Sequence, residues 1–245
     1  MSMNRRAGRR PGRGASSGLV WTPRAITGLQ LWLRADMGIT LNGGNVSAWA
    51  DQSGTGDANK NVVQATAGLQ PAFTAADGSY NSKSTVGFTG SQLLRSAAWA
   101  AALAQPLTRV VVGHGANDGT NNYFMDNLSG TQCAIIASSG AGLDMYDGAT
   151  LTATGVTPSS PQAIVTVDNG ASSKIYANAK TAKNTGAAGA GQINGTTIGN
   201  YQGGTTFALI GSIAEVLIYS GALSDATLLP LWAYLGSRYN ITIGA

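Results

Sequence analysis

Residues 211–219 read Gly-Ser-Ile-Ala-Glu-Val-Leu-Ile-Tyr and lie within a strand that we predict over Ala208–Tyr219, because β-branched, aliphatic and aromatic residues dominate it. The chain then turns, and a helix is predicted over Ser224–Tyr239. Ser224 is a suitable N-cap, and the negative charge of Asp225 suits the first turn of a helix. The large apolar residues that follow recur at helical spacing: Leu228, Leu231, Trp232 and Leu235. Pro230 falls near the start of the helix, where proline is best tolerated.

Outward from this segment, short apolar stretches alternate with turn residues along the chain, as in a β-sandwich. Asn42-Gly43-Gly44-Asn45 predicts a hairpin. Ala97–Leu103 is rich in alanine and predicts a short helical turn. Strands are predicted over Leu29–Leu33, Val46–Trp49, Thr85–Phe88, Thr108–Gly113, Tyr123–Met125, Gln132–Ala137, Gly142–Tyr146, Gln162–Val167, Ser173–Ala177 and Gln192–Ile198.

The composition favours a folded protein with many turns. Only 11% of the 245 residues are charged, 43% are hydrophobic and 34 are glycine. Glycine permits the positive φ angles that turns need, whereas disorder needs high net charge and little hydrophobicity. We therefore expect an arm over residues 1–18 and one all-β domain over residues 19–245.

Several motifs resemble the concanavalin-A-like (laminin-G-like) domains. A tryptophan strand at 28–36 precedes Trp49-Ala50-Asp51-Gln52-Ser53-Gly54, and the pattern P-x-F at 71–73 precedes V-x-F-x-G at 86–90. Residues 211–219, followed by Ala222-Leu223-Ser224-Asp225 and a closing helix, are the most specific match. The resemblance implies a jelly roll of two antiparallel sheets. Members of the family are commonly lectin-like or adhesive, and this short-helix version is similar to domains of bacteriophage particle proteins.

The positive charge of the protein is concentrated at its N-terminus. Residues 1–24 hold six arginines and no acid, so nine basic residues remain against eleven acidic ones. A nearly neutral body argues against a broad nucleic-acid-binding face. The arm is interpreted as a solvated tail, as a binder of phosphates, or as a segment that docks on an acidic partner. Its docking residues would be Arg5, Arg6, Arg9, Arg10 and Arg13.

The residues give little support for catalysis. Hydrolases on this fold use two glutamates, and Glu215 is the single glutamate of the chain. His114 is the single histidine, and no G-x-S-x-G motif or phosphate-binding P-loop accompanies it. We therefore predict a protein that is not an enzyme.

Metal binding is equally weakly indicated, so no cofactor is expected. Cys133 is the single cysteine, which excludes an internal disulfide and a cysteine metal cluster. Asp51 is a weak calcium candidate, and Asp144, Asp147 and Asn121–Asn122 are equally non-specific. The preferred interpretation of Asp51 is a turn that Ser53 and Gly54 complete, with Trp32 and Trp49 as core anchors.

Two functions remain open. The first is a structural or accessory component of a virion, a capsid decoration or a tail or fibre protein, held to capsid or tail proteins by its arm. The second is an adhesion domain that binds a bacterial surface glycan through the aromatic side chains of Tyr123, Tyr146 and Tyr201. No apolar stretch is long enough to span a membrane, and the N-terminus lacks the features of a secretion signal. The expected location is the virion, in a homo-oligomer or a large assembly.

Overall fold

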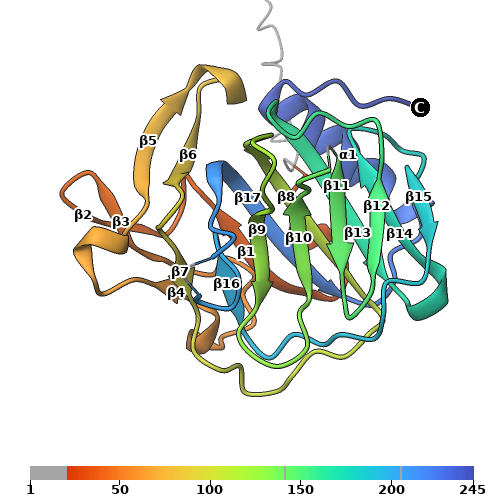
Figure 1. The fold of residues 1–245 in the computed structure, drawn as a ribbon, viewed down its shortest axis with the longest axis horizontal. Helices are drawn as coiled ribbons and strands as arrows, with labels where there is room; N and C mark the ends of the chain where they lie inside the picture. Colours follow the sequence, from red (N-terminus) through yellow and green to blue (C-terminus); the bar gives the residue numbers. More distant parts are fainter. Residues whose placement is uncertain (1–20, 141, 205) are drawn as a thin grey trace, which may run out of the picture.

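The computed structural model describes residues 21–140, 142–204 and 206–245 (Figure 1). Antiparallel hydrogen bonds join the described strands into one continuous network of 17, and the single described α-helix, α1, follows the last strand. Residues 1–18, the predicted arm with its five docking arginines, lie outside the described residues. Within the described ranges, no helix has both the length and the apolar character needed to cross a membrane.

The strands are short and separated by turns, as the composition predicts. Their bounds are β1 (Leu29–Arg34), β2 (Ile39–Asn42), β3 (Asn45–Trp49), β4 (Val62–Val63), β5 (Ala72–Asp77), β6 (Lys83–Thr89), β7 (Leu94–Arg95), β8 (Leu107–Gly115), β9 (Asn122–Asn127), β10 (Ala134–Ala137), β11 (Leu143–Tyr146), β12 (Thr150–Ala153), β13 (Gln162–Asp168), β14 (Ser173–Ala177), β15 (Asn184–Gly186), β16 (Thr196–Ile198) and β17 (Ile210–Ser220). The helices are α1 (Asp225–Tyr239) and the 3-10 turns η1 (Pro23–Ala25), η2 (Ala58–Lys60), η3 (Ala67–Leu69), η4 (Gly78–Tyr80) and η5 (Gly170–Ser172).

Strand β17 lies in the middle of the longest run of paired strands. It pairs with β1 on one side and with β8 on the other, and the run continues through β13 and β14 to β15. Residues 211–219 therefore occupy the centre of the fold, where their side chains are mostly buried. The predicted strand over Ala208–Tyr219 is confirmed, with its start moved to Ile210.

A second run of strands, β7-β16-β9-β10-β11-β12, lies in front of the first in Figure 1. The larger hydrophobic cluster takes side chains from both runs, among them Leu33 and Val216 from the first and Phe124 and Met145 from the second. Burial of this apolar surface is the main force that holds the two runs together. Trp49 also belongs to this cluster. Trp32 belongs to a second hydrophobic cluster, which lies under helix α1, so both tryptophans are core anchors as predicted.

The expectation of two separate sheets needs correction. All-β antiparallel architecture with a C-terminal helix is confirmed, but hydrogen bonds lead without a break from one run to the other. They pass from β17 through β6, β5, β3, β4, β7 and β16 to β9. The physical reason is that β17 pairs with β8 along most of its length and also with β6 over Ile210–Ile213, which carries the network around the edge.

Helix α1 covers the opposite side of the β17 run. Leu228, Leu231, Trp232 and Leu235 are buried in a second hydrophobic cluster with residues of β8, β13 and β17. The Ser224 hydroxyl accepts a hydrogen bond from the Thr227 amide at 3.2 Å, and Asn240 ends the helix in the left-handed conformation. The predicted cap and apolar side of this helix are confirmed.

The turn at Ala97–Leu103 is not helical. The backbone amides of Trp99 and Leu103 donate to the carbonyls of Asn194 and Ile193, so this stretch is held in irregular pairing with a distant segment. A tertiary contact has overridden the helical preference of alanine. The hairpin at residues 42–45 is confirmed by the pairing of Asn42 with Asn45.

Candidate functional site

The three tyrosines proposed from the sequence lie on one side of the second run of strands. Along β11, Leu143 and Met145 enter the large core, so Asp144 and Tyr146 point to the other side. Tyr123 of β9 belongs to a small hydrophobic cluster on that side, against which Tyr146 and Tyr201 pack. The structure therefore brings Tyr123, Tyr146 and Tyr201 together. We call this surface the aromatic face.

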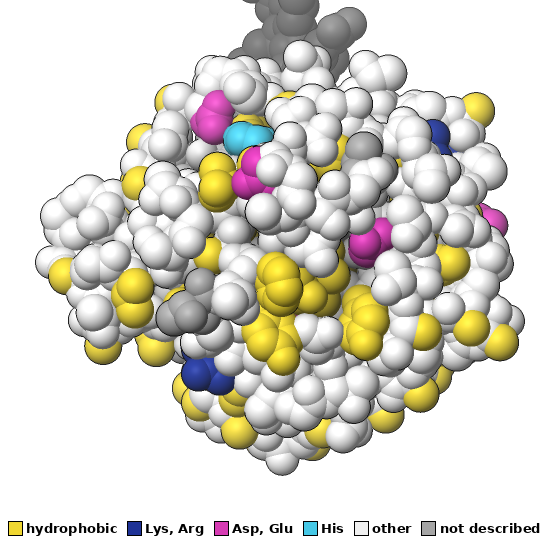
Figure 2. Space-filling view, in the orientation of Figure 1, with side chains coloured by type: hydrophobic (Ala, Val, Ile, Leu, Met, Phe, Trp, Pro, Cys, Tyr) yellow, Lys and Arg dark blue, Asp and Glu magenta, His cyan; other side chains and the backbone are white. Residues whose placement is uncertain are grey.

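An aromatic residue that the sequence analysis missed, Phe207, completes the aromatic face. Its ring stacks on Tyr123 with centroids 5.6 Å apart and meets Tyr201 edge-on at 6.2 Å. Tyr123 and Tyr201 are also edge-on, at 5.8 Å. Tyr123 is only 5% exposed beneath this group, whereas Phe207 is 47% exposed. Figure 2 shows hydrophobic side chains gathered near the centre of this side of the molecule.

The loop that carries Tyr201 and Phe207 is pinned to the strands below it. The Tyr123 amide donates to the Phe207 carbonyl at 3.1 Å, and the Gln202 side chain donates to the Gly130 carbonyl at 2.8 Å. Phe207 has a φ of 61°, in the left-handed region that bulky residues rarely adopt. Strained backbone of this kind persists only where the surroundings hold it, and it is frequent at binding sites.

Asp144 lies beside the aromatic side chains with an unpartnered carboxylate. Asp144 pairs with Ile136 of β10 on one side and with Thr152 of β12 on the other, and Ile136 in turn pairs with Tyr123 of β9. Asp144 is 8% exposed, and its Oδ1 atom is covered without accepting a hydrogen bond from any described residue. An ionised oxygen removed from water without a partner is costly, so Asp144 is the group on this face with the greatest need of a donor.

A second acid, Asp126 of β9, is enclosed below the loop. Its Oδ1 accepts hydrogen bonds from the amides of Asn127 at 2.7 Å and Cys133 at 2.9 Å. Burial raises the pKa of Asp126 to about 6, and burial also raises the pKa of Tyr123 to about 12. The described parts of β9–β12 and of residues 201–207 contain no lysine or arginine. The guanidinium of Arg95, from β7, lies against Gly203 of the loop and donates to the Leu128 carbonyl at 3.0 Å. The aromatic face is therefore apolar, with Asp144 at its β11 side and Arg95 at its β7 side.

The hydroxyl of Ser212 lies 3.1 Å from Nδ1 of His114, and the Tyr80 hydroxyl lies 3.0 Å from the same nitrogen. Burial lowers the pKa of His114, which favours the neutral imidazole. A serine nucleophile needs a base that a third group orients. Among the described residues, no carboxylate hydrogen-bonds to this ring, so the pair lacks the orienting group of a catalytic triad.

Asp51 stabilises a turn. Its Oδ1 accepts hydrogen bonds from the amides of Trp32 and Ser53, both at 2.8 Å, and its Oδ2 accepts one from the Ser53 hydroxyl. These bonds confirm the predicted turn and engage both carboxylate oxygens with donors. The Asn122 side chain binds Asp118 and Asn121 binds the Ser139 amide, so these loop residues also have protein partners.

A buried group of Cys133, Asp147 and Asp168 has potential metal ligands within 4.8 Å of one another. The cation that lies among them is Arg109. Its guanidinium contacts Asp168 at 2.7 and 2.9 Å and Asp147 at 2.9 Å, with all three side chains fully buried. Because the guanidinium of Arg109 already lies between the two carboxylates and pairs with both, this group is an internal ion cluster and does not fit a metal site.

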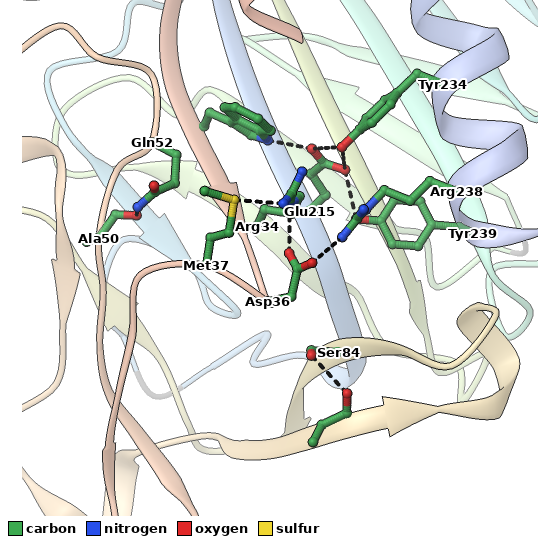
Figure 3. Close-up of polar contacts among 12 residues, drawn as sticks. Arg34, Asp36, Met37, Ala50, Gln52, Ser84, Glu215, Tyr234, Arg238 and Tyr239 are labelled. Atoms are coloured by element: carbon green, nitrogen blue, oxygen red, sulfur yellow. Dashed lines mark hydrogen bonds and ion pairs between the residues drawn. The ribbon is translucent and has the colours of Figure 1, made fainter. Parts of the chain in front are cut away.

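Glu215 is fully buried under helix α1. Figure 3 shows the hydroxyls of Tyr234 and Tyr239 directed at its carboxylate, at 3.0 and 2.7 Å, and the indole N–H of Trp32 is a third donor. Next to it, Arg34 and Arg238 both bind Asp36. Each Glu215 oxygen is occupied by donors from β1 or α1. Its role in this arrangement is to fasten the helix to the sheet.

A groove of about 610 Å³ lies beside α1, lined among others by Trp21, Lys83, Tyr234 and Arg238. Trp21 and Tyr234 are 5.5 Å apart between ring centroids. Trp21 is where the described chain begins, so the groove borders residues that the structure does not describe. None of the predicted glycan-contact residues lines it.

Comparison with solved structures supports the β-rich fold. No protein-family model and no curated protein matches the chain. Among solved structures, it is similar to a sialidase of Trypanosoma rangeli, with a TM-score of 0.56 and 11% identity over 86% of this chain and 33% of that chain. It is also similar to an arabinofuranosidase complexed with arabinofuranosyl-alpha-1,2-xylobiose, with a TM-score of 0.60 and 14% identity over 82% of this chain and 52% of that one.

A third match is to a single isolated domain, nearly all of which is covered by this chain. Domain 4 of AbnA, a GH43 extracellular arabinanase from Geobacillus stearothermophilus, was solved in complex with arabinotriose. Its TM-score is 0.54 and its identity 16%, over 83% of this chain and 98% of that domain. The chain thus spans about a third of the sialidase and about half of the arabinofuranosidase, and at these identities the likeness shows the fold alone.

The prediction of a protein that is not an enzyme is contradicted by these neighbours, which are glycosidases or parts of them. A single glutamate was too narrow a criterion, because aspartate or tyrosine can serve in glycosidic chemistry. The comparisons support a β-rich fold that occurs in carbohydrate-related proteins. They do not support the resemblance to bacteriophage particle proteins.

Proposed function

We propose that this domain binds a carbohydrate through the aromatic face. The observation that carries the proposal is the exposed Phe207, stacked on Tyr123 and edge-on to Tyr201, above strands whose other side builds the core. Binding sites for small molecules combine apolar and aromatic side chains with a few convergent polar groups. Here the polar groups are Asp144, Thr152 and the tyrosine hydroxyls.

The shape of the surface suits a chain of sugar units. Tyr123, Ile136, Asp144 and Thr152 form one row across four neighbouring strands. With about 4.8 Å between strands, such a row is about 14 Å long. The apolar side of a sugar ring stacks against aromatic carbons, while the rim of the ring presents hydroxyls to the neighbouring polar groups.

The finer fold assignment belongs to the same proposal. We infer a concanavalin-A-like jelly roll, because the large hydrophobic cluster lies between two runs of antiparallel strands and the helix covers the outside of one run. The aromatic face is then the outer surface of the other run. The similarity of this chain to an arabinanase domain of comparable extent, which was solved with arabinotriose, supports the choice of ligand class.

Replacement of Phe207 by Ala tests the proposal. Loss of an aromatic anchor at the centre of an interface costs about 2 kcal/mol or more, which is about a 30-fold increase in Kd. Binding is measured by calorimetry against neutral oligosaccharides identified on a glycan array. Leu229→Ala is the matched control, since Leu229 is 50% exposed on α1, and its affinity should equal that of the wild type.

The same measurement decides against the proposal if Phe207→Ala binds as tightly as the wild type, or if the wild type binds no glycan. Reducing ends released from each bound oligosaccharide are measured in parallel, because the structural neighbours include glycosidases. Released product would extend the proposal from binding to hydrolysis.

The sequence supports a second proposal, a virion component held by the basic arm. Its support is the charge asymmetry, with six arginines and no acid in residues 1–24 and a nearly neutral body. Salt screens the contacts of arginine with phosphate or carboxylate, so binding is measured at low salt. Under these conditions, deletion of residues 1–18 should abolish binding to capsid or tail proteins. Cosedimentation with particles measures this, and unchanged binding after deletion would exclude the arm as anchor.

A further inference from the structure

We infer that Asp144 makes the aromatic face selective for neutral sugars, by accepting hydrogen bonds from ligand hydroxyls and by repelling acidic sugars. This inference rests on the proposed function, and it goes further by naming the ligand class and the residue that selects it. The sequence indicated Asp144 only as a non-specific metal candidate and did not suggest this role.

The first step of the argument is the state of the carboxylate. Asp144 is more than nine-tenths buried, yet no side-chain hydrogen bond to it is present among the described residues. The other buried acids of the described chain differ in this respect. Asp147 and Asp168 share Arg109, and Glu215 has three donors. Asp126 accepts two backbone amides through Oδ1, although its Oδ2 has no partner among the described residues.

The second step is position. Ile136 of β10 lies between Asp144 of β11 and Tyr123 of β9 and pairs with both. A sugar ring seated against the aromatic side chains therefore has its edge near Asp144. Tyr146, two residues along β11, points to the same side and leaves its hydroxyl without a hydrogen bond to a described residue. The carboxylate and the hydroxyl are therefore two polar groups on this side of the strand that can bind ligand hydroxyls.

The third step is charge. The described residues of β9–β12 and 201–207 include Asp126 and Asp144 but no lysine or arginine. In a partly desolvated site a ligand carboxylate beside Asp144 would meet a like charge at short range. The nearest cation along this run of strands is Arg95 of β7, four strands away from β11, where its guanidinium lies against Gly203 and donates to the Leu128 carbonyl. Like-charge juxtaposition at an interface is strongly unfavourable, and it rejects wrong partners. Sialic and uronic acids are therefore excluded, although a sialidase is among the structural neighbours.

The experiment compares wild type, Asp144→Asn and Asp118→Asn. The probes are arabinotriose and xylotriose as neutral sugars, and sialyllactose and trigalacturonic acid as acidic ones, together with the neutral glycans found on the array. Asp118→Asn removes the same charge from an exposed loop, and its side-chain oxygen can still accept from Thr120. Circular dichroism and melting temperature establish that both variants are folded.

We expect Asp144→Asn to bind the neutral ligand about tenfold more weakly or worse, as for loss of a hydrogen bond to a charged group. Its preference for neutral over acidic sugars should fall by a similar factor, while Asp118→Asn keeps both values. The inference is overturned if Asp144→Asn retains affinity and preference, or if the wild type binds acidic sugars as tightly as neutral ones. In both of these cases the wild type still binds sugar and Phe207→Ala still weakens it, which distinguishes them from a failure of the proposed function.

Discussion

Replacement of Arg109 by Met is expected to lower the free energy of unfolding by about 3–5 kcal/mol, the usual cost of removing one partner from a buried charge cluster. Asp147 and Asp168 would remain in the core with no cation between them. Arg109 binds both with distances of 2.7 to 2.9 Å and is itself fully buried. Urea unfolding at pH 7, followed by tryptophan fluorescence, measures the loss.

Two further variants make this prediction sharp. Lys174→Met breaks the exposed pair with Asp225 and should cost at most about 1 kcal/mol. Arg109→Met combined with Asp147→Asn and Asp168→Asn removes the stranded charges and should recover part of the loss. A cost of Arg109→Met no greater than that of Lys174→Met would contradict the cluster as a determinant of stability.

Replacement of Glu215 by Leu is expected to cost about 2–5 kcal/mol, because it leaves the buried donors of Trp32 and Tyr239 without an acceptor. The loss should appear as a lower melting temperature. Glu215→Gln keeps the shape and one acceptor oxygen, so it should be less destabilised than Glu215→Leu. Equal stability of wild type and Glu215→Leu would show that the carboxylate does not fasten the helix.

The pH dependence of these variants is a second readout. Burial raises the pKa of Glu215 above its ordinary value of 4.5. The folded state then holds the proton more tightly than the unfolded state. The stability that this group contributes is present at low pH and is lost as the pH rises from about 4.5 through the folded-state pKa. Glu215→Gln should lack this decline, whereas other buried acids keep their own contributions in both proteins.

The elements that the sequence predicted correctly are those that local pattern specifies. Residues 211–219 are buried along almost their whole length, and the spacing of Leu228, Leu231, Trp232 and Leu235 identifies one side of a helix. Strands with weak apolar character were missed. β12 begins with Thr150, and β5 exposes most of its residues, so their pairing is fixed by neighbouring strands rather than by their own composition.

The site was predictable only where local sequence pattern reveals it. Tyr123, Tyr146 and Tyr201 were recognised as aromatic side chains near polar turns, but their meeting depends on a loop that returns across β9. Phe207 follows a polar stretch, and its place over the tyrosines depends on tertiary contacts such as the bond between its carbonyl and the Tyr123 amide. The sequence indicated Asp144 only as a non-specific metal candidate, because a lone aspartate in a short strand shows neither its burial nor its missing donor.

The alternation along β10 and β11 has a consequence for how this surface can change. Ile135, Leu143 and Met145 belong to the large core, while Ile136 and Asp144 point to the other side, where Ile136 is buried in the small hydrophobic cluster. The half-buried residues of that side, Tyr146 and Thr152, can therefore be varied without altering the large core. A combinatorial library restricted to the outward positions would explore new ligand preferences on an unchanged scaffold, and natural drift can follow the same route.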